Sequence, residues 1–403
     1  MNYSEIYREL TRNILPFWSG SMMDMHEGGF YGRIDGNGMP HPKADKGIVL
    51  NARILWTFSA AYRVIKRMDY LDVAERAYNY IRERFIDDKY GGVYWMLNNK
   101  GEPINTKKQT YAQCFAIYGL YEFWCASGNS EAMSIAIDLF RLIEDNCRDR
   151  KNGGYFEAFS RDWGAIDDVR LSEKDANEQK SMNTHLHILE AYTGMCLSVS
   201  SHELMQAQSE LIQIFTDKIV RQNGHLGLFF DEEWNIKSDD ISYGHDIEAS
   251  WLLYEAAEAL ENQELISKIA KISQKIADAA AEGIGDDGGM AYECKNGIID
   301  YDRHWWVQAE AVAGYIIAYR NTQDRRYSTL AKRAMQYIKH NVIDFENGEW
   351  FWSLNLDGSA NRIDDKAGPW KCPYHNGRMC LVAIKNHRTL KQIHEDNKLI
   401  VND

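Results

Sequence analysis

The sequence lacks the features that mark secreted and membrane proteins. Its seven cysteines are an odd number and form no CxxC pair, a pattern that suits free thiols in a reducing cytosol better than a disulfide framework. The amino terminus, MNYSEIYREL, is charged and has no apolar stretch of the kind found in a signal peptide. No apolar run is long enough to cross a bilayer. We therefore expect a cytoplasmic protein without a membrane partner.

The sequence also lacks a basic stripe and the common nucleotide motifs. Its net charge is −13, spread along the chain, whereas binding to nucleic acid requires lysine and arginine to neutralise phosphates. No GxxxxGK[ST] loop, dinucleotide fingerprint or GxSxG elbow is present. These absences argue against nucleic acid as a partner and leave a neutral small molecule as the expected ligand.

Proline is scarce, and its distribution predicts helices. Of the six prolines, none lies between Pro103 and Pro369. A proline inside a helix costs about 3 kcal/mol, so this gap permits a long series of helices. Apolar residues recur with helical i, i+3, i+4 spacing, which predicts helices with one buried face. These stripes occupy residues 50–65, 115–123, 186–195, 251–260 and 307–318.

Short segments of glycine and aromatic residues occur six times. Each copy is followed by the next after roughly 60 to 70 residues, which leaves room for two helices and a loop with a short hairpin. Six such units predict an all-α fold, an (α/α)6 barrel of twelve helices with short β-hairpin loops at one end, formed by residues 1–403 as a single domain. An open array of helix pairs is the alternative. The copies lie at 28–31, 91–95, 153–156, 227–230, 288–292 and 348–352.

Three histidines stand where inner helices begin or have just begun. These are His187, His245 and His375. The positive end of the helix dipole favours a neutral imidazole, which can act as a base near pH 7. Singly, each is as well explained as a structural histidine, but three at equivalent positions would converge on one pocket.

Two histidine–glutamate pairs have i, i+3 spacing, which suits either metal binding or orientation of the imidazole. For His245 and Glu248 we favour orientation, and for His187 and Glu190 the spacing leaves both open. His185 and His187 lie two positions apart and face different sides of a helix, so they are poor joint metal ligands.

Further candidates come from residues expected on the inner helices. A buried Arg53 needs a partner and is either half of an ion pair or a ligand-binding group. Trp306 and Trp370 are either core residues or platforms for a sugar ring. The remaining candidates are Tyr111, Asn183, Trp251 and Glu310.

Taken together, these segments resemble the cellobiose 2-epimerases of the N-acylglucosamine 2-epimerase superfamily. The resemblance runs nearly from end to end. Its most specific parts are KGIVLNARILW at 46–56, YGGVYWM at 90–96, KSMNTHLHILEAYT at 180–193, SYGHDIEASWL at 242–252, WWVQAEAV at 305–312 and GPWKCPYHNGRMC at 368–380.

The resemblance implies an (α/α)6 barrel that epimerises C2 of the reducing-end glucose of β-1,4-linked disaccharides, without metal or other cofactor. It implies that His187, His245 and His375 are catalytic. Arg53 would bind near O1 and O2 of the sugar, and Glu248 would be the partner of His245. Substrate-binding roles fall to Tyr111, Asn183, Trp251, Trp306, Glu310 and Trp370. We expect a monomer or a weak homodimer.

The implied reaction removes the C2 proton of an opened sugar and returns a proton to the opposite face. His245 and His375 are the expected pair of bases, with His187 serving ring opening and Arg53 stabilising the enediolate. Three rival functions stay open: an aldose–ketose isomerase of the same superfamily, an (α/α)6 glycoside hydrolase using Glu248 and Glu310, and a carbohydrate-binding protein without activity.

Overall fold

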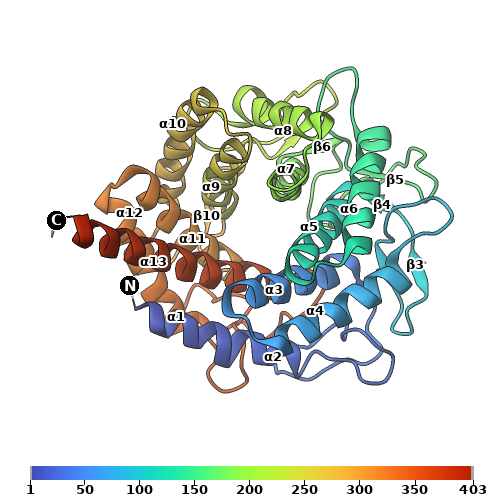
Figure 1. The fold of residues 1–403 in the computed structure, drawn as a ribbon, viewed down its shortest axis with the longest axis horizontal. Coiled ribbons are helices and arrows are strands. Elements are labelled where there is room, and N and C mark those ends of the chain that lie inside the picture. Colours follow the sequence, from blue (N-terminus) through green and yellow to red (C-terminus); the bar gives the residue numbers. More distant parts are fainter. Residues whose placement is uncertain (1, 401–403) are drawn as a thin grey trace.

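The computed structural model describes the backbone of residues 2–400 and the side chains of residues 2–387. Its centre is a ring of inner helices in which each helix contacts the next and the last contacts the first (Figure 1). The ring is therefore closed, as the (α/α)6 prediction requires and an open array does not. The inner helices are α3 (Ile48–Ile65), α5 (Thr110–Ser127), α7 (Met182–Cys196), α9 (Tyr243–Ala259), α11 (Trp305–Thr322) and α13 (Tyr374–Ile400).

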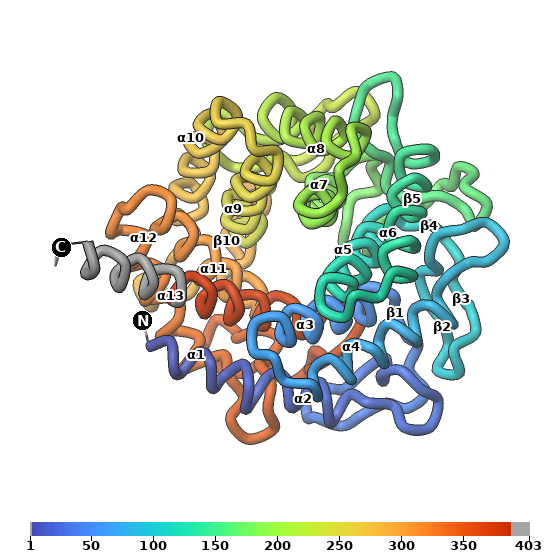
Figure 2. Tube along the Cα trace, in the orientation of Figure 1, coloured from blue at the N-terminus to red at the C-terminus, as the bar shows by residue number. Residues whose placement is uncertain are grey.

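An outer layer of helices surrounds this ring. Each outer helix packs on the inner helix that precedes it in the chain, and α1 (Tyr3–Glu9) packs on α13, which brings the first and last helices side by side (Figure 2). The first outer position is divided into α1, the π-helix η1 (Leu10–Ile14) and α2 (Leu15–Ser19). The other outer helices are α4 (Met68–Tyr80), α6 (Ser130–Leu142), α8 (His202–Ile214), α10 (Gln263–Ala280) and α12 (Arg325–Tyr337).

The expectation of one buried face is wrong for the inner helices. In α3, every residue from Ile48 to Ala61 is buried. The reason is that an inner helix is enclosed between the outer layer and the barrel interior, and a helix enclosed on all sides has no solvent face to be polar. The outer helices do show the amphipathic pattern, with alanine and leucine facing inward on α6 and charged residues outward.

A tight turn follows each outer helix and closes with an isolated antiparallel bridge. Four outer helices, α4, α6, α8 and α12, continue into a π-helix before this turn: η2 (Ile81–Phe85), η3 (Ile143–Cys147), η4 (Phe215–Ile219) and η6 (Ile338–Val342). The first outer position instead ends in α2, after η1, and α10 continues into the 3-10 helix η5 (Ala281–Gly283). The bridges are Met23–Phe30, Ile86–Val93, Arg148–Tyr155, Val220–Leu226, Ile284–Met290 and Ile343–Trp350. They coincide with the glycine–aromatic copies, so the repeat read from the sequence is confirmed.

The strands connect neighbouring repeats, which the sequence did not predict. A short strand before an inner helix pairs with the hairpin region of the next repeat, as β1 (Lys46–Gly47) does with β2 (Met96–Leu97). The bridge between Ile34 and Ala367 joins the last repeat to the first. The other strands are β3 (Pro103–Asn105), β4 (Lys108–Gln109), β5 (Ala158–Phe159), β6 (Lys180–Ser181), β7 (Phe229–Phe230), β8 (Ile241–Ser242), β9 (Glu293–Lys295) and β10 (Ile298–Asp300). They pair as β1-β2-β3, β4-β5, β6-β7 and β10-β9-β8.

Buried lysine–aspartate pairs fasten the turns to the inner helices. Lys108 Nζ lies 2.9 Å from Asp87 Oδ2, and both side chains are fully buried. The aspartate also accepts backbone N–H groups of its own turn, so one carboxylate organises both the turn and the start of the helix. The same arrangement recurs in Lys46–Asp24, Lys180–Asp149 and Lys366–Asp344.

Among the described residues, no helix is both long and apolar enough to span a membrane.

Candidate active site

A cavity of ≈ 500 Å³ opens at the end of the barrel where the inner helices begin. Nine of the eleven predicted site residues line it, and Trp251 and Glu310 do not. The nine come from every inner helix of the ring: Arg53, Tyr111, Asn183, His187, His245, Glu248, Trp306, Trp370 and His375, with Trp370 on the loop that leads into α13. The predicted convergence of the three histidines on one cavity is thus observed.

Each of the three imidazoles is held through its Nδ1 atom. His187 Nδ1 lies 2.9 Å from Glu190 Oε2, and His375 Nδ1 lies 2.8 Å from Glu310 Oε1. Because an ionised carboxylate only accepts hydrogen bonds, these two rings carry their proton on Nδ1, which leaves Nε2 unprotonated when the ring is neutral. The open choice for His187 and Glu190 is resolved in favour of orientation.

The predicted pairing of His245 with Glu248 is wrong. His245 Nδ1 instead lies 2.7 Å from Ser242 Oγ. Ser242 is the N-cap residue of α9, yet its hydroxyl caps no backbone N–H, whereas Ser181 at the N-cap of α7 does accept one. A hydroxyl can donate or accept, so Ser242 allows either tautomer of His245.

Glu248 belongs to a buried cluster around Arg378, which sequence reasoning missed. The Arg378 guanidinium donates to Glu190, to Glu248 and to Glu310, the last at 2.7 Å. Tyr374 also donates to Glu190. Three buried carboxylates on separate inner helices require a nearby positive charge. That requirement was the signal in the sequence that could have identified Arg378.

This cluster joins two of the catalytic candidates. Glu190 and Glu310 each bind both Arg378 and one histidine. Glu248 Oε1 lies 3.9 Å from His375 Nδ1. Arg378 is therefore a buried support that fixes the carboxylates behind His187 and His375.

Burial keeps the two expected bases neutral. It lowers the pKa of His245 to about 3, with the charges of His187 and Arg53 acting in the same direction. Burial also lowers the pKa of His375 well below its ordinary value. The prediction of neutral imidazoles agrees with these directions, but the first cause is burial rather than the helix dipole.

The carboxylates behind the histidines differ from one another. Burial and the neighbouring Glu310 raise the pKa of Glu248 to about 7. Burial alone would also raise the pKa of Glu190, but Arg378 and His187 lower it to about 2. Glu190 is thus ionised beside its histidine, whereas the Glu248 carboxyl holds its proton to a higher pH.

Arg53 and Asn183 present polar atoms to the cavity. Arg53 donates to Tyr111 Oη at 2.7 Å, and its Nε atom has no hydrogen-bond partner among the described residues. The same is true of Asn183 Oδ1. Buried polar groups without partners are costly, and these two belong to residues that line the cavity.

Aromatic rings form the walls of the cavity. The Trp306 ring centroid lies 4.7 Å from that of His245 and 5.6 Å from that of His375. The Trp370 ring centroid lies 6.2 Å from that of Tyr111. The sequence reasoning missed the stacked pair of Tyr292 and His304, the loop 171–175, and Trp305, Trp352 and Asp364, which also line the cavity.

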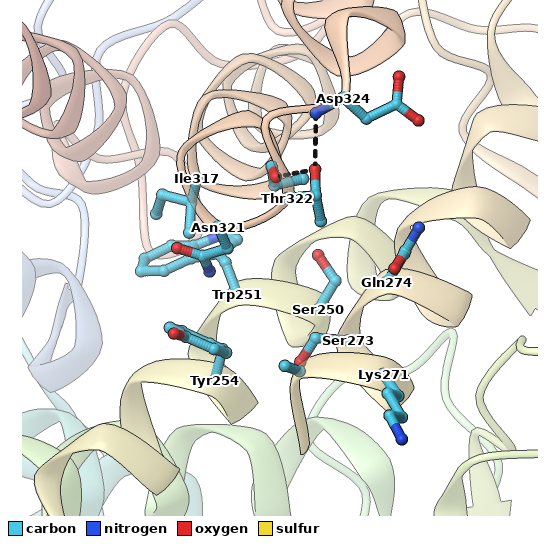
Figure 3. A pocket seen from close by; sticks show the side chains of 12 residues that line it. Ser250, Trp251, Tyr254, Lys271, Ser273, Gln274, Ile317, Asn321, Thr322 and Asp324 are labelled. Carbon is cyan, nitrogen blue, oxygen red and sulfur yellow. Dashed lines mark hydrogen bonds between the residues drawn. The ribbon is translucent and has the colours of Figure 1, made fainter. Parts of the chain in front are cut away.

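Trp251 and Glu310 support the site from behind and do not line the cavity, and their role in binding substrate stays a prediction. Trp251 Nε1 donates to Glu310 Oε2 at 3.2 Å, and its ring lies 4.7 Å from the Arg378 guanidinium carbon. The other side of the indole lines a separate cavity of ≈ 400 Å³ between α9, α10 and α11, where it faces Ile317 and Asn321 (Figure 3).

Glu248, Glu310 and His375 form a cluster of residue types that can bind a metal ion. One potential ligand atom from each lies within 4.8 Å of the others. The Arg378 guanidinium already donates to both carboxylates, so the protein itself supplies a positive charge at this point.

Comparison with known proteins agrees with this geometry. The family model for N-acylglucosamine 2-epimerase matches residues 29–377. The chain is 54% identical to a cellobiose 2-epimerase from Bacteroides fragilis, covering 94% of this chain and 98% of that protein. It is 40% identical to one from Ruminococcus albus, covering 95% and 98%.

A solved structure gives the same answer for the fold. The cellobiose 2-epimerase from Bacillus thermoamylovorans superposes with a TM-score of 0.92 at 40% identity, covering 96% of this chain and all of that one. The chain therefore belongs to the N-acylglucosamine 2-epimerase family and is a sugar epimerase.

Proposed function

We propose that this enzyme reversibly epimerises C2 of the reducing-end glucose or mannose of β-1,4-linked disaccharides, so that cellobiose becomes glucosyl-mannose. The observation that carries the proposal is the set of three imidazoles lining one cavity, each held through Nδ1. The Nε2 atoms are then available to a substrate. The cellobiose 2-epimerases among the relatives favour a disaccharide over a single sugar.

The reaction follows from the acidity of the C2 proton in the open-chain aldose. One base removes this proton to give a planar cis-enediolate, and the other returns a proton from the opposite face. We assign these two steps to His245 and His375, and ring opening with proton transfer at O1 or O5 to His187.

Arg53 supplies the positive charge that the enediolate needs. Its guanidinium lies 4.1 Å from the Phe115 ring centroid and 4.9 Å from that of Tyr374, so it is held in a buried aromatic setting. A fixed charge in such a setting stabilises a developing anion more strongly than the same charge in water.

The cavity has room and partners for a disaccharide. Trp306 and Trp370 offer flat surfaces to the C–H faces of two rings, and Asn183 adds an amide side chain to the lining. We also propose that residues 1–403 form a single catalytic domain, that it acts in the cytosol as a monomer or a weak homodimer, and that it needs no metal or other cofactor. The seven unpaired cysteines support the cytosolic location.

The glycoside hydrolase alternative is less well supported. It requires two carboxylates across the scissile bond. Glu310 does not line the cavity, and both Glu248 and Glu310 are engaged by Arg378. Glu310 therefore does not face a substrate in the cavity, and Glu248 alone cannot supply both carboxylates.

A single incubation separates the possible activities. With cellobiose or mannobiose in deuterated water, NMR should show the C2 epimer with deuterium at C2. A ketose product would indicate the aldose–ketose isomerase, free monosaccharides the hydrolase, and binding without turnover a non-catalytic protein.

Two variants test the assignment of the bases. We expect His245→Ala and His375→Ala each to lower the epimerisation rate by about 10²- to 10⁴-fold, the usual contribution of a positioned acid or base. The matched control is His202→Ala, because His202 is exposed on α8. Wild-type epimerisation in either folded variant would refute the two-base assignment.

A further inference from the structure

Glu349 is the residue that departs from the repeat. In the turns after the outer helices, one backbone carbonyl accepts the N–H that closes the turn, and Gly29, Gly92, Gly154 and Glu349 supply that carbonyl in the four turns of the same length. All four residues have positive φ, with 62° at Glu349. The left-handed conformation is unfavourable for a residue with a Cβ, and such outliers persist where the surroundings impose them.

The Glu349 side chain enters the protein interior and is fully buried. Its Oε1 accepts hydrogen bonds from Asn376 Nδ2 at 2.6 Å and from Trp18 Nε1 at 3.2 Å. Its Oε2 accepts from Lys371 Nζ at 2.5 Å and from the Trp350 backbone N–H. Four donors thus converge on one carboxylate.

Comparison of the repeats shows what this carboxylate replaces. In four repeats, a polar side chain near the start of the inner helix accepts the N–H of the residue that follows the turn. These acceptors are Gln113, His185, Asp246 and Gln308. Asn376 occupies the same place in the sequence pattern, five residues after Lys371. In this repeat Glu349 lies between the turn and the helix and binds both.

Lys371 is in an equally unusual position. The buried lysines of the other repeats pair with the aspartate of a turn, but here Lys366 already binds that aspartate, Asp344. Lys371 is fully buried and has Glu349 as its ion-pair partner. A buried ammonium without a partner would be strongly unfavourable, so Glu349 fixes where Lys371 lies.

The two residues that Glu349 holds flank a catalytic candidate. Lys371 and Asn376 lie on either side of His375, and Trp370 precedes Lys371 directly. The same segment contacts Arg53, which donates to the Trp370 carbonyl at 3.4 Å. One carboxylate therefore anchors the short segment that carries both His375 and Trp370.

We propose that Glu349 is a positioning residue for the epimerisation: it fixes segment 370–376 so that His375 meets the reacting carbon at the correct distance and direction. This inference rests on the proposed function. Glu349 does not line the cavity, so it acts through His375 and not on the substrate.

The test uses Glu349→Gln in the full-length protein. A glutamine cannot satisfy four donors, because its amide nitrogen would face at least one of them, so the anchor is lost with little change in volume. We expect kcat to fall about 10- to 100-fold while KM changes less than about threefold. The control is Glu122→Gln, a buried carboxylate paired with Arg63 towards the far ends of α3 and α5.

A second readout separates positioning from general loss of structure. In deuterated buffer the enediolate either returns to the starting sugar with deuterium at C2 or proceeds to the epimer. If one of the two bases is displaced, this partition (the ratio of labelled starting sugar to epimer) should change. The change should be larger when the reaction starts from one epimer than when it starts from the other. A smaller amount of folded enzyme leaves the partition unchanged.

A double variant guards against failure to fold. Glu349→Gln with Lys371→Met removes the buried unpaired ammonium, and it should keep the altered partition while recovering stability. Wild-type kcat and partition in both variants would overturn the proposal. If the wild-type enzyme acts on no disaccharide, the proposed function fails, and the ring signals of His375 in ¹H–¹³C NMR decide the positioning role: they should shift in Glu349→Gln and not in Glu122→Gln. Unshifted signals would likewise overturn it.

Discussion

At the scale of single residues, the three catalytic candidates share a way of being held but differ in the group that holds them. His187 and His375 form hydrogen bonds with carboxylates that also bind Arg378, whereas His245 forms a hydrogen bond with the hydroxyl of Ser242. A carboxylate fixes one tautomer and a hydroxyl allows two. Of the two bases that we propose, His375 is thus held in one tautomer and His245 can adopt either.

This difference predicts opposite effects for two serine variants, one of which should lower kcat and the other stability. Ser242→Ala removes the hydroxyl that holds His245 Nδ1, so kcat should fall about 10-fold, as for other residues that orient reacting groups. Stability should change little, because Ser242 caps no N–H. Ser181→Ala should instead cost about 1 kcal/mol of stability and leave kcat unchanged, since Ser181 caps α7 by accepting from Thr184 at 3.1 Å. Initial rates and urea denaturation measure both, and a kcat loss in Ser181→Ala equal to that in Ser242→Ala would contradict the assignment.

The residues that sequence reasoning identified are those whose chemistry shows in their own motif. His187, His245, His375 and Arg53 lie in segments that resemble the family, and all line the cavity. Arg378 stands in one of the same segments but was missed, because its role depends on three glutamates brought together by separate helices. The partner of His245 was misassigned because i, i+3 spacing also places Ser242, three residues before it, within reach of the ring.

At the scale of elements, the helices and turns at the open end of the barrel could be predicted from the sequence, but the strand pairs could not. The inner helices were predictable from apolar spacing and the turns from glycine next to aromatics. The strand pairs between repeats were not, because two-residue strands carry no periodicity and their partners lie in another repeat.

The turn after α6 contains two adjacent glycines whose substitution distinguishes backbone strain from steric crowding. Gly153 and Gly154 both have positive φ, but a Cβ on Gly153 would meet nothing within 4 Å. A Cβ on Gly154 would lie 2.4 Å from the Trp234 ring and 2.7 Å from His185 Nε2. We expect Gly153→Ala to cost roughly 1 kcal/mol of unfolding free energy and Gly154→Ala roughly 3 kcal/mol. Urea denaturation would measure both, and equal losses would show that the turn relaxes around the added methyl.

At the scale of the whole molecule, the enclosed barrel places ionisable groups far from water and so ties stability to pH. Burial raises the pKa of Glu157 to about 8 and that of Glu9 to about 7. The pKa of His225 is also raised: burial opposes the charge, but the hydrogen bond to Asp246 outweighs it. Each of these groups holds its proton in the folded state at a pH where the unfolded chain has lost it.

The sign of the effect follows from proton binding. Between pH 6.5 and 8 these three groups bind more protons in the folded protein than in the unfolded chain, so the stability that they contribute falls as the pH rises. Glu157 is almost fully buried, and it alone should contribute up to about 1.4 kcal/mol per pH unit in this range. Glu157→Gln resembles the protonated acid at every pH. Its urea midpoint should therefore fall less steeply than that of the wild type from pH 6.5 to 8.

The Glu157 carboxyl suits this test because it binds the start of an inner helix and not the substrate. Its oxygens accept from the Thr184 hydroxyl at 2.6 Å and the Ser181 N–H at 2.8 Å, so the variant keeps a polar partner for the turn. Glu122→Gln is the control, since Glu122 pairs with a partly exposed arginine. Parallel pH profiles for the wild type and Glu157→Gln would mean that water reaches Glu157 and that the barrel wall between α5 and α7 is more open than its packing suggests.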